Sequence, residues 1–421
     1  MTAHQNLLPA PMSNKTKEVS EAIPQRKPLF GQSIDELNFL MEAHGQRPYR
    51  AGQLAEALYR QRATSLDEIT TLPASLREAL AAEAYTIGLP EIVQTARSID
   101  GTERYLIRMA DGETVETVWM PDGDGGERGD GSLAAEEEES EEKAGNTAIF
   151  PYRRATICIS SQVGCAVNCQ FCLTAKLGIR RNLTPGEIAG QVAAVLNRHR
   201  LDLGSSRGNP TPARINLVFM GMGEPFLNYA NFMAAVRLLV YMRISESRMT
   251  VSTSGILPGI LDFAREAIRP KLAVSLNAPN DVIRESIMPI TRKWNIAALF
   301  EALKTIPLRN REWITFEYVM LGGINDSLAN ADELIALVRN MPCKINLIVW
   351  NSGPNMPYHE PSQAGVYAFQ NRIIDAGIPA YIRRPRGRDI YAACGQLKRT
   401  LESDPVPAPL VEISPAASLA G

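Results

Sequence analysis

The 421-residue chain has few cysteines, few histidines and little net charge, and each scarcity excludes certain classes of protein. It holds only six cysteines and four histidines, and its formal net charge is −2. So few cysteines in so long a chain argue against a disulfide framework and suit a reducing compartment. The chain also lacks an apolar run of membrane-spanning length and a basic leader followed by an apolar stretch. We therefore expect a cytoplasmic protein with no membrane association.

The small net charge conceals an uneven distribution. Residues 121–150 contain ten acidic and two basic side chains, a local charge of −8, so the remainder carries +6. We interpret residues 121–150 as a flexible acidic surface insertion that takes no part in catalysis. The rest of the chain is mildly basic, which permits an RNA partner without requiring one.

Three of the cysteines stand close together, at Cys165, Cys169 and Cys172, with Phe171 beside the last. In a short loop this spacing lets all three sulfur atoms face one centre. A cubane iron–sulfur cluster takes thiolate ligands on its irons, so three cysteines leave one iron open to a further ligand. Cys158 lies upstream and could complete a closed four-ligand zinc site instead. Both interpretations remain open at this stage.

The chain divides into segments of distinct composition. Polar residues and prolines predict a disordered tail at the start, and a proline- and alanine-rich stretch predicts another at the end. Ser33 to Glu36 form a capping box that opens a helical region. Asp111–Gly112 is a turn dipeptide between two strand-like runs. The predicted parts are a tail (1–29), a helical accessory domain (30–95), a β-hairpin (96–120), the acidic insertion (121–150), a core (151–400) and a second tail (401–421).

From residue 151 short apolar strands alternate with helical patterns, which indicates parallel pairing. Strands are predicted at 155–160, 214–220, 249–253, 272–276, 314–320 and 344–349, with a last strand at 379–384. Helices are predicted at 184–197, 229–242, 257–267, 296–305, 329–340 and 364–376. Six units are too few for a closed eight-unit barrel, so we predict an α/β fold with an open, partial (βα)6 barrel. A doubly wound sheet is the alternative.

In either fold the carboxyl ends of the strands carry the site, and polar groups gather there in the sequence. Gly221-Met222-Gly223-Glu224-Pro225 follows the second strand, where glycines permit close backbone approach and Glu224 offers a carboxylate to an amino group. Hydroxyls and amides end or follow three further strands, at 252–254, 275–277 and Asn351. Such groups suit the hydroxyls of a ribose and the edge of an adenine.

These motifs together resemble the radical S-adenosylmethionine (SAM) enzymes, in which Cys-x3-Cys-x2-Cys follows the first strand of a partial barrel. Four segments resemble, more narrowly, the RNA adenine C2-methyltransferases of the RlmN family: 160–165, 252–255, 343–347 and 393–397. The related adenine C8-methyltransferases, the Cfr group, share this layout. The resemblance covers residues from about 30 to 400 and leaves out the acidic insertion and both tails.

The resemblance implies a cofactor role for each matching residue. Cys165, Cys169 and Cys172 would hold a [4Fe-4S] cluster whose open iron binds SAM. Gly223 and Glu224 would meet the SAM amino group. The rest of the cofactor would contact Ser252, Ser275, Leu276, Asn277 and Asn351. The family usually has a histidine where Asn277 stands, so only a backbone contact carries over at that position.

The resemblance also implies a radical route for the methylation of adenine. The target carbon is an aromatic C–H that is neither nucleophilic nor acidic, so direct methyl transfer from SAM should fail. One SAM methylates Cys394, and a second yields a 5′-deoxyadenosyl radical that takes hydrogen from the S-methyl group. The resulting carbon radical joins the adenine, and Glu116 removes the ring proton. Cys158 then attacks Cys394, which gives a transient disulfide and releases methylated RNA.

The implied partners are 23S rRNA in its peptidyl-transferase region, some tRNAs beside the anticodon, and a flavodoxin-type electron donor; we expect a monomer. RNA contacts are predicted at three groups of basic residues, each of which has a solvated surface as its plain alternative. These groups are Arg47, Arg50, Arg60 and Arg62; Lys176, Arg180 and Arg181; and Arg383, Arg384, Arg386 and Arg388. A non-enzymatic RNA-binding protein with a closed four-cysteine metal site is the remaining alternative.

Overall fold

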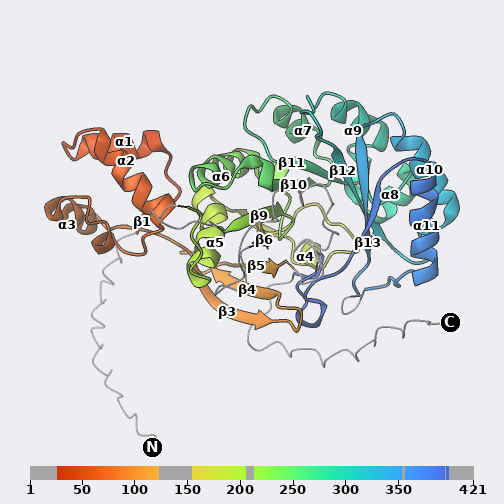
Figure 1. Ribbon diagram of the computed structural model, residues 1–421, viewed down its shortest axis with the longest axis horizontal. Coiled ribbons are helices and arrows are strands. Elements are labelled where there is room, and N and C mark those ends of the chain that lie inside the picture. Colours follow the sequence, from red (N-terminus) through yellow and green to blue (C-terminus); the bar gives the residue numbers. More distant parts are fainter. Residues whose placement is uncertain (1–25, 123–153, 205–212, 353–355, 394, 398–421) are drawn as a thin grey trace, which may run out of the picture.

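The computed structural model describes residues 26–122, 154–204, 213–352, 356–393 and 395–397 (Figure 1). The predicted C-terminal tail lies outside these residues, as does Cys394. Most of the predicted N-terminal tail and of the acidic insertion also lie outside them. Ordered structure begins earlier than predicted, because β1 (Lys27–Pro28) pairs with β2 (Tyr85–Thr86) and Leu29 is buried beside them. No helix within the described residues is long and apolar enough to cross a membrane.

A ten-stranded sheet forms the centre of the molecule. Its parallel part contains the six predicted strands and the last one, in the order in which they occur along the chain. These strands are β6 (Arg154–Cys158), β9 (Arg214–Phe219), β10 (Met249–Thr253), β11 (Lys271–Ser275), β12 (Ile314–Met320), β13 (Cys343–Val349) and β14 (Ala380–Arg383). A doubly wound sheet would reverse its strand order at a switch point, and this order does not reverse. The partial barrel is therefore confirmed, with β14 as its open edge.

Helices cover the outer face of the curved sheet (Figure 1). They are α5 (Pro185–Arg198), α6 (Tyr229–Tyr241), α7 (Leu257–Phe263), α9 (Ile296–Leu303), α10 (Leu328–Val338) and α11 (Gln363–Asp375). Several begin at side-chain caps, including Thr184, Asn295, Ser327 and Ser362. An additional short helix, α8 (Asp281–Ile287), was not predicted and is capped by Asn280. Single helical turns precede or follow the longer elements at η4 (Pro225–Asn228), η5 (Glu246–Arg248), η6 (Pro289–Arg292) and η7 (Arg388–Ile390).

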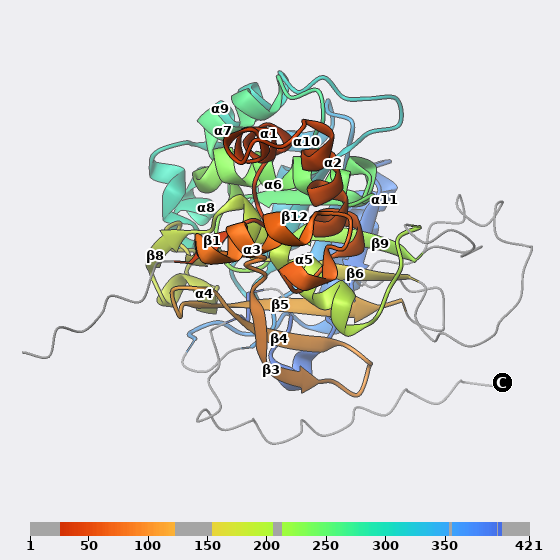
Figure 2. The same cartoon turned by 90° about the vertical axis from the view of Figure 1, so that its left-hand side faces the viewer.

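The antiparallel part of the sheet extends the barrel at β6. The predicted hairpin is present as β4 (Glu103–Arg108) and β5 (Thr114–Pro121), and β5 pairs with β6. A third strand, β3 (Glu91–Arg97), forms the outer edge. In the side view of Figure 2 these three strands run beneath the accessory helices. The extension joins the accessory helices to the wall of the barrel.

The accessory region consists of short helices, as predicted. These are α1 (Ile34–Ala43), α2 (Tyr49–Ala55), its π-helical continuation η1 (Glu56–Gln61), the turn η2 (Leu66–Glu68) and α3 (Ala74–Ala82). The capping box at Ser33 and Glu36 is confirmed. Arg62 donates to Asn197 Oδ1 (2.9 Å) and Leu201 O on the barrel. Arg60 lies over the Tyr241 ring, 4.8 Å from its centroid. These two half-buried arginines fasten the accessory helices to the core, and contact of this basic group with RNA stays a prediction.

Candidate active site

A cavity of about 160 Å³ lies at the carboxyl ends of the parallel strands. The three clustered cysteines all line it. So do six of the seven predicted cofactor residues: Gly223, Glu224, Ser252, Ser275, Asn277 and Asn351. Leu276 is fully buried and does not line the cavity. Segments more than 200 residues apart in sequence thus meet at one place, since Gly395 and Leu397 also form part of the wall.

The cysteine loop is held by its neighbours rather than by regular secondary structure. It follows the short strand β7 (Gln162–Gly164), which pairs with β8 (Ile179–Asn182), and it ends at the one-turn helix α4 (Leu173–Lys176). The Cys165 amide donates to Gly178 O at 2.9 Å. Gly164 has φ +83°, and a Cβ there would lie 1.8 Å from that same carbonyl oxygen. Only glycine allows the chain to enter the loop this way.

The three thiols fit a cluster better than a single ion. Burial raises the pKa of Cys165 to about 12 and the pKa of Cys169 well above its usual value, so a metal must displace protons on binding. Among the described residues no three His, Cys, Asp or Glu side chains are arranged to hold one metal ion. The cysteines of a cubane bind different irons and stand farther apart than the ligands of one ion. Cys158 is buried at the end of β6 and does not line the cavity, which counts against a closed zinc site.

The Gly-Met-Gly-Glu motif follows β9 and forms one wall of the cavity. Gly223 has φ +101°, and a Cβ there would lie 2.5 Å from Cβ of Gln162. The absence of a side chain at Gly223 therefore makes room for Gln162, and not only for a ligand as the sequence suggested. Glu224 is buried, and its carboxylate accepts hydrogen bonds from the Ser254 amide (2.7 Å), the Ser254 hydroxyl (2.8 Å) and the Phe226 amide (3.0 Å). Burial raises the pKa of Glu224, and these hydrogen bonds oppose the shift.

A polar network that the sequence analysis missed crosses the cavity floor. Ser252 Oγ donates to Glu317 Oε2 at 2.8 Å and lies 3.2 Å from Ser275 Oγ. Glu317 Oε1 forms a buried ion pair with Arg383 at 3.2 Å. Glu317 lies within β12, where a carboxylate in an apolar run gives no sign of facing inward. Its paired register with Ser275 places both side chains on one face of the sheet.

Two asparagine side chains at the cavity differ in the hydrogen bonding of their amide oxygens. Asn277 is buried at φ +59°, and its Oδ1 accepts from the Val319 amide at 2.8 Å. Asparagine tolerates this left-handed conformation better than most residues, and its side chain fixes the adjoining strand end. Asn351 Oδ1 is buried against the cavity and has no hydrogen-bond partner among the residues that the structure describes. An orphaned buried acceptor is unfavourable, so this atom marks a place where a ligand donor fits.

Of the three predicted catalytic residues, Glu116 and Cys158 do not line the cavity, and Cys394 lies outside the described residues. Glu116 is buried on β5, contrary to the solvent-facing orientation usual for a strand glutamate, but it does not line the cavity. Its backbone carbonyl accepts from Ser160 Oγ at 2.6 Å, and that hydroxyl accepts in turn from the Met222 amide. Cys158 pairs in register with Val118 and Val218. Gly395 O, next to position 394, accepts from the Leu173 amide at 2.8 Å, which ties this segment to the cysteine loop.

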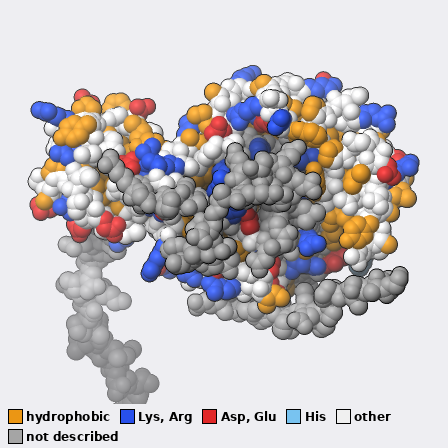
Figure 3. Space-filling view, in the orientation of Figure 1, with side chains coloured by type: hydrophobic (Ala, Val, Ile, Leu, Met, Phe, Trp, Pro, Cys, Tyr) orange, Lys and Arg blue, Asp and Glu red, His pale blue; other side chains and the backbone are white. Residues whose placement is uncertain are grey.

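Two of the four arginines near the C-terminus, Arg383 and Arg386, are buried, whereas Arg384 is exposed, so phosphate contact by this run stays a prediction. Arg383 pairs with Glu317, Arg386 is buried and pairs with Asp100 at 3.3 Å, and Arg388 pairs with Glu360. Arg180 and Arg181 likewise pair with acidic side chains, at Glu113, Asp111 and Glu187. On the visible face in Figure 3 the basic side chains form several separate groups mixed with acidic ones. These ion pairs stabilise the two segments, and RNA contact by the exposed members Lys176, Arg180 and Arg384 stays a prediction.

Comparisons with known proteins agree with this site. The model of the Radical SAM superfamily matches residues 159–335. A probable dual-specificity RNA methyltransferase RlmN of Koribacter versatilis is 56% identical over 361 residues, which cover 86% of this chain and 98% of the relative. A dual-specificity RNA methyltransferase RlmN of Anaeromyxobacter sp. is 44% identical, with 89% and 91% covered. The crystal structure of a radical SAM methyltransferase from Sphaerobacter thermophilus has a TM-score of 0.74 and 39% identity, and the match covers 89% of this chain and 99% of that one.

Fold and site together define a radical SAM enzyme, a methyltransferase acting on RNA. The chain belongs to the RlmN family of dual-specificity RNA methyltransferases. A [4Fe-4S] cluster and SAM are the cofactors of this family. The three-cysteine wall and the orphaned Asn351 acceptor of the cavity fit them.

Proposed function

We propose that this enzyme methylates C2 of one adenine in the peptidyl-transferase region of 23S rRNA and of the adenine 3′ to the anticodon in some tRNAs. The observation that carries the proposal is the shared cavity, whose wall includes both the cysteine loop and the residues that follow position 394. Gly395, the residue after Cys394, contacts the cysteine loop through the Leu173 amide, which supports a ping-pong route in which Cys394 itself is methylated. Methylation of C8 on the same rRNA adenine is the alternative outcome.

In this proposal Cys165, Cys169 and Cys172 hold the cluster. Gly223 and Glu224 meet the amino group of SAM, and the ligand set is completed by Ser252, Ser275, Leu276, Asn277 and Asn351. When bound, the cluster and SAM supply the methyl group and the radical chemistry. The protein's residues orient the cofactor and exclude water. Burial of the Glu224 carboxylate and of the unpartnered Asn351 oxygen supports these two assignments.

Cys394 carries the methyl group, Glu116 accepts the ring proton, and Cys158 resolves the adduct by thiol attack. Both Glu116 and Cys158 lie on the adjoining strands β5 and β6, close to the Ser160 hydroxyl that contacts the Gly-rich motif. Burial of Glu116 suits a carboxylate that must take a proton away from water. Thiol attack leaves Cys158 and Cys394 oxidised as a disulfide, so external reduction must follow each turnover.

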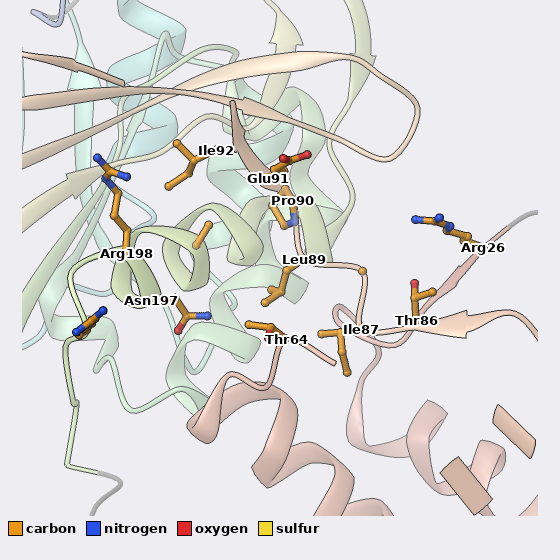
Figure 4. Close-up of a pocket in the computed structure, with 13 residues that line it drawn as sticks. Arg26, Thr64, Thr86, Ile87, Leu89, Pro90, Glu91, Ile92, Asn197 and Arg198 are labelled. Carbon is orange, nitrogen blue, oxygen red and sulfur yellow. The ribbon is translucent and has the colours of Figure 1, made fainter. Parts of the chain in front are cut away.

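The RNA backbone has one further candidate contact. An open hollow of about 720 Å³ lies where the accessory helices meet the barrel, and Arg26, Arg198 and Arg200 line it (Figure 4). Its acidic member, Glu91, pairs with Arg108, and its basic member Arg198 pairs with Glu103 at 3.6 Å, so the basic character of the lining rests on Arg26 and Arg200. None of the predicted site residues lines this hollow, so we assign it to phosphate contact and not to chemistry. A flavodoxin-type donor, a monomeric state and a cytoplasmic location complete the proposal.

The test is nucleoside analysis after incubation of the reconstituted protein with SAM, a reductant and either 23S rRNA or tRNA. We expect 2-methyladenosine from both RNAs. Cys394→Ala should give none, whereas Cys343→Ala, a matched change of a buried thiol on β13, should retain activity. 8-Methyladenosine, or a product from Cys394→Ala, would overturn the proposal.

A further inference from the structure

One buried arginine beside the cavity forms no ion pair within the part of the chain that the structure describes. Five arginines are buried among the described residues, and four of them form ion pairs with carboxylates: Arg104, Arg269, Arg383 and Arg386. The fifth, Arg284 on α8, is 1% exposed and has no described carboxylate within ion-pair distance. A buried charge is costly unless an opposite charge compensates it. The charge of Arg284 is therefore not compensated by an ion pair with any described carboxylate.

All the hydrogen bonds of Arg284 go to neutral oxygens. Its guanidinium donates to Leu276 O (3.0 Å), Thr291 Oγ1 (3.0 Å), Ser254 O (2.7 Å) and Ser275 O (3.2 Å). Two of these acceptors belong to residues that line the cavity, Ser254 and Ser275. The charge is thus held directly behind the cavity wall, in a fixed orientation.

The cysteine loop contacts the end of α8, the helix that carries Arg284. The Gln170 amide, next to Cys169, donates to Ile287 O at the end of α8 at 2.9 Å. Burial lowers the pKa of Arg284 to about 10, and the negative charges of a Cys169 thiolate and of the Asp281 carboxylate oppose that shift. One of the two groups that offer negative charge to Arg284 is therefore a proposed cluster ligand, and the other, Asp281, accepts a hydrogen bond from the Ile296 amide at 2.8 Å and forms no ion pair with Arg284.

We propose that Arg284 is the permanent counter-charge of the iron–sulfur cluster and makes its one-electron reduction easier. The proposal rests on the assignment of Cys165, Cys169 and Cys172 as cluster ligands. Reduction adds negative charge to a centre already ligated by three thiolates, and a fixed cation in a poorly solvated wall stabilises the reduced form. Net charge and hydrogen bonding are established determinants of cluster potential. Arg284 is a positioning and tuning residue in this scheme and does not touch substrate.

The alternative is that Arg284 has a purely structural role and only connects α8 to the ends of β10 and β11 through its hydrogen bonds. Arg269 provides a matched control, since it is 2% exposed, pairs with Glu312 Oε1 at 2.7 Å and does not line the cavity. A purely structural role predicts that Arg284→Gln and Arg269→Gln behave alike. A charge role predicts that only the first changes the cluster potential.

The experiment is an EPR-monitored redox titration of the reconstituted full chain without RNA. We expect Arg284→Gln to shift the midpoint downward, so that the reduced-to-oxidised ratio at a fixed potential falls about tenfold, equivalent to about 59 mV. Arg284→Lys, which keeps the charge but loses the forked hydrogen bonds, should stay within about twofold of wild type. Arg269→Gln should leave the potential unchanged.

A second variant covers the case in which Arg284→Gln does not fold. Thr291→Asp places a carboxylate at the Arg284 guanidinium and should lower the potential in the same direction. Equal shifts in Arg284→Gln and Arg284→Lys, or no shift in Arg284→Gln and Thr291→Asp, would overturn the proposal. Failure of the wild-type protein to assemble a cluster would instead refute the cysteine assignment, which iron content and the EPR signal report separately.

Discussion

The carboxylate of Glu116 lies 3.4 Å from the guanidinium of Arg104, and both side chains are buried. The two residues belong to the paired strands β4 and β5, and Arg104 Nη1 also approaches Tyr391 O at 3.5 Å. The proposed base is therefore held by a cation that also contacts the C-terminal segment. This ion pair links the hairpin extension to the proposed catalytic base.

The Arg104–Glu116 pair should contribute to stability as well as to position. Arg104→Met leaves the carboxylate buried beside an apolar group, which should cost about 3 kcal/mol of unfolding free energy. Chemical denaturation measures this, and the double variant with Glu116→Gln should recover part of the loss. A loss below about 0.5 kcal/mol, as for an ordinary surface change, would contradict a compensating role for Arg104.

The cysteines should separate into ligands and packing residues. Replacing Cys165, Cys169 or Cys172 with Ala removes a cluster ligand, so each variant should lose its iron and brown colour. Cys343→Ala should keep both, because Cys343 is buried within β13, where burial raises the pKa of its thiol to about 11. Iron content after anaerobic reconstitution decides the matter, and a cluster that survives loss of any of the three would refute the assignment.

Gly223 should not tolerate a side chain. Gly223→Ala combines a backbone conformation unfavourable for alanine with a Cβ 2.5 Å from Cβ of Gln162. We expect a loss of about 1–3 kcal/mol in unfolding free energy, together with weaker SAM binding. Gly112→Ala is the control: Gly112 also has a positive φ, but a Cβ there would meet open space. Equal losses in both variants would show that the crowding at Gln162 has no effect.

The accessory helices should detach when their arginine contact is removed. Arg62→Ala deletes hydrogen bonds to Asn197 and Leu201, at a cost of about 1–3 kcal/mol. Limited proteolysis should then cleave between the accessory helices and the barrel faster than in wild type. The exposed Arg47 gives the control, since Arg47→Ala should change nothing, and unchanged cleavage of Arg62→Ala would refute the docking role.

His199 should make stability fall in mildly acidic solution. Its ring stacks on Trp119 and lies 2.7 Å from the Tyr105 hydroxyl, and burial lowers the pKa of His199 below its usual 6.5. The unfolded chain therefore binds the proton more readily, so this contribution is present above pH 6.5 and is lost as the pH falls through the lowered value. His199→Gln should flatten the stability profile in that range; an unchanged slope would contradict the assignment.

The barrel was predictable because its strands are short apolar runs bounded by recognisable caps. β10 and β12 cover the predicted residues without a shift. The edge strand β3 could not be predicted in the same way, since it is polar, half exposed and interrupted by an irregular register between Ile92 and Gln94. Local pattern identifies buried strands but not strands that depend on a partner.

The site shows the same division between local and distant information. The cysteine spacing and the Gly-rich motif are contiguous in sequence, so they could be read directly. The roles of Glu317 and Arg284 could not be predicted, because they depend on contacts with strands and loops that are distant in sequence. Arg383 and Arg386 differ from the prediction for the converse reason: clustered charge in sequence predicts an exposed surface, whereas these two arginines are buried with acidic partners from distant segments.

The central claim is that the methyl group reaches RNA through the protein, and Cys158→Ala tests it most directly. Without the resolving thiol, the protein should remain covalently joined to RNA. After nuclease digestion, mass spectrometry should find a nucleotide attached to the peptide that contains Cys394. Normal turnover by Cys158→Ala with no such adduct would contradict the account.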